Sequence, residues 1–272
     1  MKYVAFLDIL GFKNKLRNLK HTSAKEYIGK YSSCIYNIFM NTNSNREING
    51  YIVSDSVILY SRDTSENSLD TLVRMIKEIC RSEFTRNGIL IRGAIAKGEF
   101  DKIPATELPK LQKQLIVGQA YVDAYLLENS VKVIGINLSE EVYQDIINAN
   151  IPSDVFVEKN GKDTNYLLRC INMNFLLNKR NLSRFIKLAQ NSKWLPHYYN
   201  TIHFAIKNER DSKKIEELLT AIEEVVCDGK PSENWRQLDD FIRNVFSEGV
   251  IDGFKQRFLK HIRHHLITKY NE

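Results

Sequence analysis

The stretch Tyr3–Phe12 constrains the fold most, because it joins a strand-like apolar run to an acid and then a glycine. The run Val4–Leu7 precedes Asp8, and Gly11 separates that acid from a helical pattern. Nothing in the apolar run could neutralise a buried Asp8, so we expect its carboxylate to be paired, metal-bound or at the surface. Open α/β sheets place ligands at the carboxyl ends of strands, which is where Asp8 falls.

A second acid, Asp55, stands in a similar frame. Apolar residues flank it in Tyr51–Tyr60, and the polar triplet Ser54–Ser56 predicts a tight turn that carries Asp55 to the tip of a strand pair. Helix capping or turn stabilisation, both common roles of aspartate, would explain either acid alone. Two carboxylates at neighbouring strand ends are what a Mg²⁺ or Mn²⁺ site for nucleotide phosphates requires, so we predict that they act together.

Composition is that of an ordinary globular protein. The chain has 272 residues, 43% hydrophobic and 26% charged, and no apolar run long enough to span a bilayer. Its net charge of +6 is scattered, so it predicts neither nucleic-acid nor membrane binding. The N-terminus lacks a signal-peptide pattern and the four cysteines form no Cys-x-x-Cys pair, so we expect a cytoplasmic protein with reduced thiols.

Hydrophobic spacing predicts an α+β domain followed by helices. Strands are predicted at Tyr3–Ile9, Tyr51–Ser61 (a pair), Ile89–Glu99, Leu115–Val117, Val131–Leu138, Val155–Val157 and Tyr166–Leu168. Helices are predicted at Lys13–Met40, Ser68–Phe84, Gly118–Glu128 and after Ser139, with a polar loop or short helix at 101–113. This order is that of a ferredoxin-like palm. Only helical patterns follow Ile171, so we predict one domain at 1–172 and a helical region at 173–272.

Two motifs give the chain a resemblance to a known family. Residues 6–12 (Phe-Leu-Asp-Ile-Leu-Gly-Phe) resemble the first metal-binding motif of class III nucleotidyl cyclases, and Ser54-Asp55 resembles the Gly-Asp of their second-metal hairpin. Within that superfamily the chain looks most like the pyrimidine cyclases of bacterial anti-phage (Pycsar) systems. The resemblance covers residues 1–170 and implies a class III cyclase-type palm, here with a C-terminal helical extension.

The resemblance also implies a ligand set. Asp8, Asp55 and the Ile9 carbonyl would hold two Mg²⁺ or Mn²⁺ ions, and the backbone at Gly11 and Phe12 would offer N–H groups to phosphate. The implied reaction is attack of the ribose 3′-hydroxyl on the α-phosphate of a nucleoside triphosphate, giving a 3′,5′-cyclic monophosphate and pyrophosphate. Catalytic domains of this class pair head to tail, so the resemblance further implies a homodimer.

The resemblance also suggests residues that bind the phosphates and the base. Residues 92–98 resemble the cyclase strand motif Arg-x-Gly-Ile-x-x-Gly, which makes Arg92 a catalytic candidate and Lys97 a phosphate-binding one, although ordinary ion pairs would explain both equally well. Tyr51 replaces the lysine that reads purines, and Leu115 replaces the aspartate of adenylyl cyclases. Both losses favour UTP or CTP, although tyrosine is also an ordinary strand residue.

Two departures keep other functions open. Val122 replaces the ribose-orienting asparagine of the family, and Leu126 replaces its transition-state arginine. The first alternative is therefore a degenerate cyclase-like sensor or scaffold that binds nucleotide without turnover. The second is an interaction module acting through the helices after residue 172. His261, His264 and His265 lie among basic residues, which favours a solvated helix over a zinc site.

Overall fold

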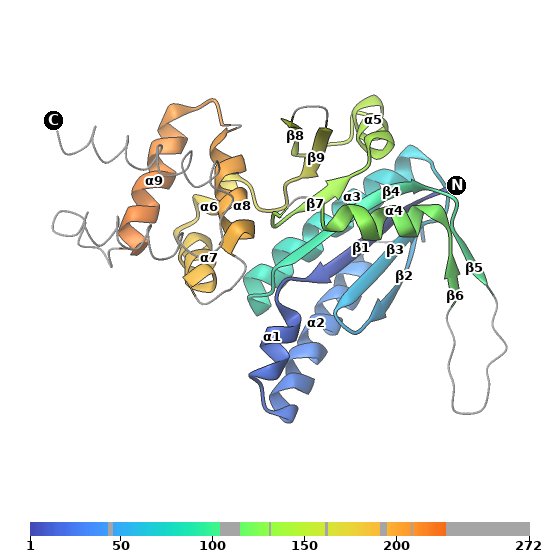
Figure 1. Ribbon diagram of the computed structural model, residues 1–272, viewed down its shortest axis with the longest axis horizontal. Helices are drawn as coiled ribbons and strands as arrows, with labels where there is room; N and C mark the ends of the chain where they lie inside the picture. The colour runs from blue at the N-terminus through green and yellow to red at the C-terminus, as the bar shows by residue number, and fades with distance from the viewer. Residues whose placement is uncertain are drawn as a thin grey trace. The chain divides into compact units, whose positions relative to one another are not determined.

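The computed structural model describes residues 1–42, 46–103, 115–130, 132–160, 163–190, 195–207 and 209–226. The chain divides into two compact units (Figure 1). The first comprises Met1–Val131 with Gly135–Cys170, and the second comprises Lys132–Ile134 with the chain from Ile171 onward. No helix among the residues described is both long enough and apolar enough to cross a membrane.

A seven-stranded sheet forms the centre of the first unit, in the order β2-β3-β1-β4-β7-β9-β8. Its strands are β1 (Lys2–Ile9), β2 (Ile48–Val53), β3 (Ser56–Ser61), β4 (Ile91–Gly98), β7 (Ile136–Leu138), β8 (Val155–Asn160) and β9 (Asp163–Leu168). β1 pairs antiparallel with both β3 and β4, β2 pairs antiparallel with β3, and β4 and β7 are parallel. The order β4-β1-β3-β2 is that of a ferredoxin-like palm, so the predicted α+β class is confirmed.

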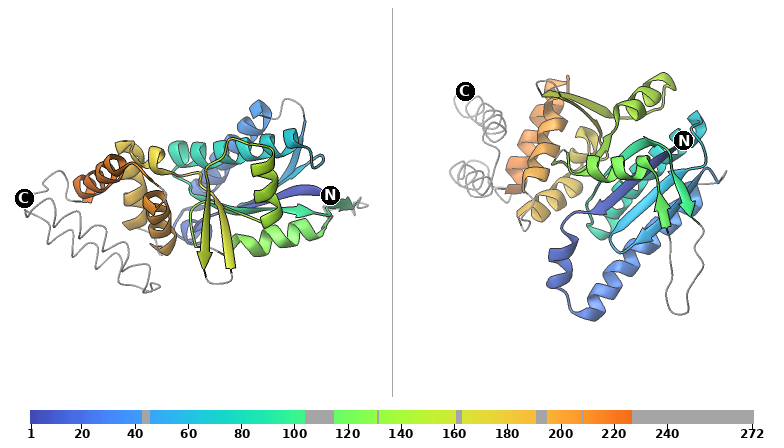
Figure 2. Two further views of the ribbon diagram at one scale, coloured as in Figure 1. Left: turned by 90° about the horizontal axis from the view of Figure 1, so that it is seen from above. Right: turned by 45° about the vertical axis from the view of Figure 1, so that its right-hand side comes forward.

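Helices cover both faces of this sheet (Figure 2). They are α1 (Phe12–Arg17), α2 (His21–Thr42), α3 (Glu66–Ser82) with the π-helical turn η1 (Glu83–Asn87), α4 (Gln119–Glu128) and α5 (Glu140–Asn148). The hydroxyl of Ser65 accepts the N–H of Ser68 at the start of α3, and Ser139 caps α5 as the sequence predicts. The N-terminal boundaries of α3 and α5 are therefore set by side chains.

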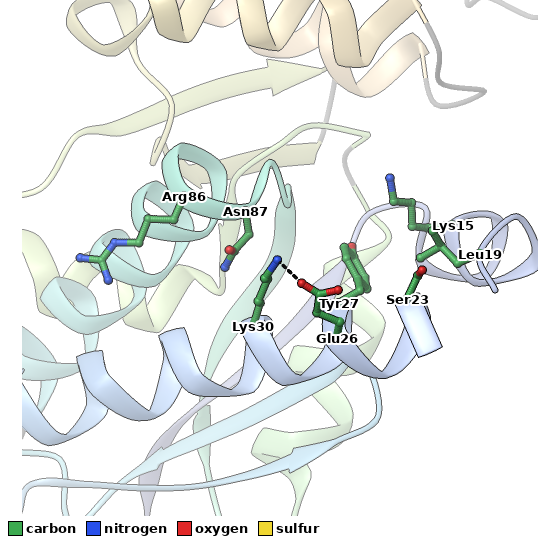
Figure 3. Close-up of a pocket in the computed structure, with 8 residues that line it drawn as sticks. All are labelled: Lys15, Leu19, Ser23, Glu26, Tyr27, Lys30, Arg86 and Asn87. Carbon is green, nitrogen blue, oxygen red and sulfur yellow. Dashed lines mark ion pairs between the residues drawn. The ribbon is translucent and has the colours of Figure 1, made fainter. Parts of the chain in front are cut away.

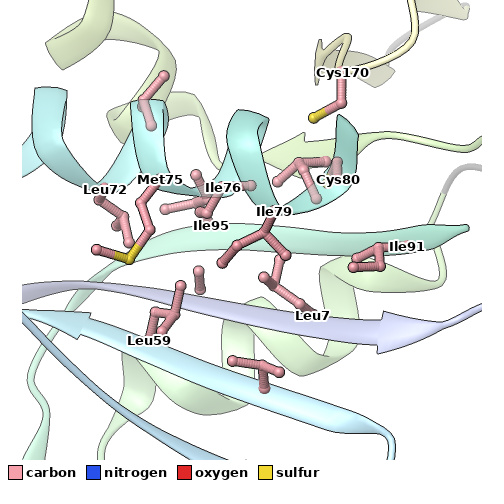
Figure 4. Close-up of a cluster of buried hydrophobic side chains, with 14 of the residues drawn as sticks. Leu7, Leu59, Leu72, Met75, Ile76, Ile79, Cys80, Ile91, Ile95 and Cys170 are labelled. Atoms are coloured by element: carbon pink, nitrogen blue, oxygen red, sulfur yellow. The ribbon is translucent and has the colours of Figure 1, made fainter. Parts of the chain in front are cut away.

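The alternation of β1 divides the core into two layers. Tyr3, Ala5, Leu7 and Ile9 pack with α2 and α3, whereas Val4 and Phe6 pack with α4. Figure 4 shows the first layer, where α3 lies over Leu7, Leu59 and Ile95. Each fully buried aliphatic side chain there contributes roughly 1.5 to 3 kcal/mol to the free energy of unfolding. Because α2 and α3 cover one face of β1, a charged side chain of this strand is better accommodated on the face that α4 covers, with Val4 and Phe6.

Two segments of the first unit differ from the prediction. The polar segment after Phe100 begins as a strand: β5 (Asp101–Ile103) pairs with β6 (Leu115–Val117) in a separate two-stranded sheet. β7 is shorter than the predicted Val131–Leu138, because Lys132–Ile134 folds with the second unit.

The described part of the second unit after Ile171 is helical. It contains α6 (Met173–Leu176), α7 (Lys179–Gln190), α8 (Leu195–Lys207) and α9 (Ser212–Val226). Phe185 of α7 meets Tyr198 of α8 edge to face with ring centroids 5.0 Å apart, and the Thr201 hydroxyl accepts the N–H of Ile134 at 3.0 Å. The predicted helices Asn234–Phe246 and Ile251–Tyr270, with their histidines, lie outside the described residues.

Candidate active site

Asp8 extends the row of β1 side chains that faces α4. Val4 and Phe6 fill that row with apolar contacts, and Asp8 follows two residues later, at the open end of the strand, with 20% of its side chain exposed. Burial raises the pKa of its carboxyl group, and the charge of Asp55 raises it further. The ionised form of Asp8 is therefore disfavoured at this strand end.

Asp55 is brought to Asp8 by the turn between β2 and β3. Ser56 lies directly across from Asp8 in the β1–β3 ladder, so the preceding residue sits beside the acid. Ser54 adopts a left-handed backbone with φ of 59°, which closes the turn, and the Tyr31 hydroxyl of α2 donates to the Asp55 carbonyl at 3.1 Å. The predicted hairpin thus places two carboxylates together.

Arg92 lies opposite Asp8 on β4 and faces the same side of the sheet. Its Nη2 is 3.5 Å from Oδ2 of Asp8, whereas its Nε is 2.6 Å from Oε1 of Glu128 at the end of α4. Its Nη1 donates to Oδ1 of Asn129 at 3.2 Å. The short contact to Glu128 and the long one to Asp8 mean that Arg92 is held mainly by α4 and only partly neutralises Asp8.

The acidic pair fits a hard divalent cation. Apart from Arg92 and Asp55, Asp8 receives a long 3.4 Å hydrogen bond from Ser56, so within the described part of the chain no short contact from a protein donor to its oxygen atoms is seen. No cluster of three or more His, Cys, Asp or Glu side chains with metal-ligand geometry occurs in the described part of the chain. Two carboxylates suit Mg²⁺ or Mn²⁺, which commonly complete their shells with water and substrate phosphate. The Ile9 carbonyl lies next to this pair at the end of β1.

The phosphate-binding turn proposed from sequence has mixed support. Gly11 takes the left-handed conformation, with φ of 78° and ψ of 14°, and Phe12 begins α1 as a buried residue. Glycine is therefore required by the backbone at this turn. α1 is only six residues long, so its dipole adds little to the attraction of an anion.

Tyr51 lies on the α4 side of β2, near the row that carries Asp8. Its ring stacks on Tyr60 with centroids 5.8 Å apart, its hydroxyl is 3.5 Å from that of Tyr60, and Lys102 of β5 lies over it. Burial and the Tyr51 hydroxyl raise the pKa of Tyr60 to about 12. Tyr51 is thus a half-buried aromatic surface with a polar end on the same face of the sheet as the acids.

The structure does not bring Lys97 to this group. Lys97 pairs with Asp145 of α5 at 2.6 Å and lies over the ring of Tyr3, on the sheet face that packs with α2 and α3. It is five residues from Arg92 along β4, or about 17 Å, and points to the opposite face. An ion pair with α5, the ordinary alternative, accounts for it.

Glu128 is the site residue that sequence reasoning missed, although its signal was present. Ala120, Ala124 and Glu128 recur every four residues of α4, and all three are buried. An acid that continues a buried row of small residues needs a cation, and Arg92 supplies it. Burial raises the pKa of Glu128, and the charge of Arg92 opposes that rise.

Comparisons with known proteins find similar solved structures but no similar family model or curated sequence. No protein-family model matches the chain, and no curated protein sequence matches it. Among solved structures, the adenylyl cyclase CyaB from P. aeruginosa is 17% identical over 61% of this chain and 92% of that one, with a TM-score of 0.47. The guanylate cyclase domain of RhGC from Catenaria anguillulae, in complex with GTP, is 16% identical over 61% and 94%, with a TM-score of 0.49.

Proposed function

We propose that the protein is a metal-dependent nucleotidyl cyclase that converts UTP or CTP to the 3′,5′-cyclic monophosphate and pyrophosphate. The observation that carries the proposal is the pair Asp8 and Asp55 at the end of β1, with Arg92 alongside. The arrangement provides two carboxylates for cations and one guanidinium for phosphate on one face of a palm sheet, which is what phosphoryl transfer needs.

In this proposal Asp8, Asp55 and the Ile9 carbonyl would hold two Mg²⁺ or Mn²⁺ ions. When bound, such ions favour loss of the proton from the ribose 3′-hydroxyl and offset charge on the departing pyrophosphate. Arg92, oriented by Glu128, would place a fixed positive charge beside the reacting phosphate. The backbone N–H groups at Gly11 and Phe12 would contact phosphate oxygen atoms.

Pyrimidine specificity would come from Tyr51. Its half-buried ring offers a flat apolar surface on the acidic face of the sheet, and its hydroxyl, 3.5 Å from that of Tyr60, lies at the edge of an aromatic cluster. A single ring with one polar end suits a small base better than the charged lysine that reads purines in similar enzymes. Support for an anti-phage second messenger made in the cytoplasm comes from the sequence resemblance alone.

A homodimer is supported by apolar residues on the outer side of α4. Val122, Tyr125 and Leu126 are 44%, 50% and 64% exposed, and Ile103 and Val117 of the β5–β6 sheet are similarly uncovered. Contiguous exposed apolar side chains are typical of protein interfaces. A second copy covering them could also supply the cation that Leu126 does not.

The first experiment is incubation of purified protein with each of the four ribonucleoside triphosphates and Mn²⁺, with products identified by chromatography and mass. We expect a cyclic pyrimidine product whose formation falls more than about a hundredfold in Asp8→Asn and Asp55→Asn, because even outer-sphere partners of a metal contribute 10- to 100-fold. Asp70→Asn, which removes a carboxylate paired with Arg74 on α3, is the matched control and should retain activity. A cyclic purine product would keep the enzyme class and refute the role of Tyr51.

A second candidate is a cyclase-like domain that binds nucleotide without turnover. It is favoured by Leu126, an exposed apolar side chain in place of the transition-state arginine, and by the commitment of Arg92 to Glu128. If no triphosphate yields product but Mn²⁺-dependent nucleotide binding is lost in Asp8→Asn, this candidate replaces the first. If Asp8→Asn changes neither turnover nor binding, both are wrong.

A further inference from the structure

A pocket of about 340 Å³ opens between α1, α2 and η1, and neither Asp8 nor Asp55 lines it (Figure 3). Its walls include Lys15, Ser23, Tyr27, Lys30, Arg86 and Asn87. Its volume lies at the lower end of the range for small-molecule sites, about 300 to 1,000 Å³. A small ligand would therefore fill it.

The lining is basic. Figure 3 shows Lys15 and Arg86 on opposite sides, with Lys30 and Tyr27 between them. Among the lining residues the acid is Glu26, and its 2.6 Å pair with Lys30 is more than 60% exposed on both sides, so the pair holds Lys30 weakly. Burial and the charges of Glu83 and Asp55 raise the pKa of Tyr27 to about 12, so two further acids lie near that wall. Lysine and arginine groups around a hollow with hydroxyl and amide neighbours are the usual partners of a phosphoryl group.

The pocket is distinct from the acidic pair but connected to it through α2. It lies on the α2 and α3 side of the sheet, whereas Asp8 faces α4. The Tyr27 ring, in the pocket wall, stacks on Phe12 at the start of α1, with centroids 6.5 Å apart. One helical turn later, the Tyr31 hydroxyl donates to the Asp55 carbonyl. A ligand in contact with Tyr27 is therefore linked through side-chain contacts to the β1–α1 turn and, through α2, to the turn that carries Asp55.

We propose that this pocket is a regulatory anion site that takes the phosphoryl group of a small molecule. Lys15, which lies over the Tyr27 ring, binds the phosphate oxygen atoms, and Lys30 joins it by exchanging Glu26 for the ligand. Arg86, whose guanidinium points away from these two lysines in Figure 3, turns inward to complete the site, and Tyr27 carries the effect to Phe12. The binding site stands independently of the proposed cyclase activity, whereas its regulatory effect rests on that activity.

The test is isothermal titration of the full chain with three probes, namely inorganic phosphate, pyrophosphate and UMP, in EDTA so that no divalent cation bridges them to the acids. We expect at least one probe to bind, and Lys15→Gln or Arg86→Gln to weaken it by roughly tenfold or more, since each removes a charge-assisted hydrogen bond. Lys13→Gln is the matched control, an exposed lysine of α1 outside the pocket, and should bind like the wild type. The ranking of the three probes identifies the source of the phosphoryl group.

Two results would overturn the site. One is that no probe binds, or that Arg86→Gln and Lys13→Gln bind alike. The other is that a probe binds only when Mn²⁺ replaces EDTA and that this binding disappears in Asp8→Asn, which would assign the anion to the acidic pair. Where turnover is measurable, the bound probe should change its rate in the wild type but not in Arg86→Gln, and an unchanged rate would refute the coupling through Tyr27. Binding without any cyclase activity would keep the site and refute the proposed function, so the two failures are distinguishable.

Discussion

Glu83→Gln should make the protein more stable in alkaline solution and leave it nearly unchanged in acid. Glu83 begins η1 and is fully buried. The Asn87 side chain donates to its Oε2 at 2.8 Å, but its Oε1 has no hydrogen-bond partner among the described residues. Burial raises the pKa of Glu83 from 4.5 to about 7, against the opposing effects of Asn87, Cys34 and the charge of Arg86.

The magnitude follows from the two pKa values. Between pH 4.5 and about pH 7 the folded protein keeps a proton on Glu83 that the unfolded chain releases, because the pKa rises from 4.5 to about 7 on folding. Stability from this group is therefore fully present below pH 4.5 and is lost as pH rises through about 7. A pKa difference of that size corresponds to about 3 kcal/mol in the free energy of unfolding. Glutamine keeps the shape and removes the titration, so the variant should not lose this amount.

The assay is urea unfolding followed by circular dichroism between about pH 4 and about pH 8, with wild type and Glu83→Gln compared at each pH. The difference in unfolding free energy between the two should grow by about 3 kcal/mol in favour of the variant as pH rises. Glu141→Gln, at an exposed position of α5, is the control and should run parallel to the wild type. A constant difference between wild type and Glu83→Gln at every pH would refute the argument from burial.

Two further predictions concern the acidic face. Arg92→Leu should lower the free energy of unfolding, measured in urea, by about 3 to 5 kcal/mol, because it leaves Glu128 buried without its cation. The double variant Arg92→Leu with Glu128→Leu should recover most of that loss. A double variant as unstable as Arg92→Leu alone would contradict this. Tyr51→Ala should reduce turnover of the pyrimidine triphosphate more than it weakens Mn²⁺ binding, measured by titration of the metal. Tyr36→Ala, an exposed tyrosine of α2, should change neither, and equal losses of both in Tyr51→Ala would remove its role in base reading.

The palm was predictable because apolar residues recur at regular intervals in its strands and helices. The alternation in β1 and the helical spacing of α3 each point one row of side chains to the same core, which fixes both the element and its face. β5 escaped prediction because Asp101–Ile103 is fully exposed and gains its strand form only from pairing with β6, a contact distant in sequence.

The acidic pair of the candidate site was predictable because a single hairpin brings its two residues together. Asp8 and Asp55 meet because β3 returns beside β1, and the turn at Ser54 sets the register. Lys97 was grouped with Arg92 by motif, although an odd separation of five residues puts the two on opposite faces of a strand. Glu128 was passed over because its meaning depends on Arg92, which lies 36 residues earlier and reaches it only in the folded sheet.

The charges of this face bear on the order in which ligands bind. Asp8, Asp55 and Glu128 set three carboxylates against the single guanidinium of Arg92, so the cluster is net negative when all are ionised. A free triphosphate is also strongly negative, and at a partly buried site the repulsion between the two is poorly screened. Divalent cations held by Asp8 and Asp55 would offset this negative charge, while Glu128 and Arg92 would stay paired beside them. A nucleotide should therefore bind this face as its metal complex or after the metal, and the buried Glu128–Arg92 pair keeps the Arg92 guanidinium in place until the nucleotide arrives.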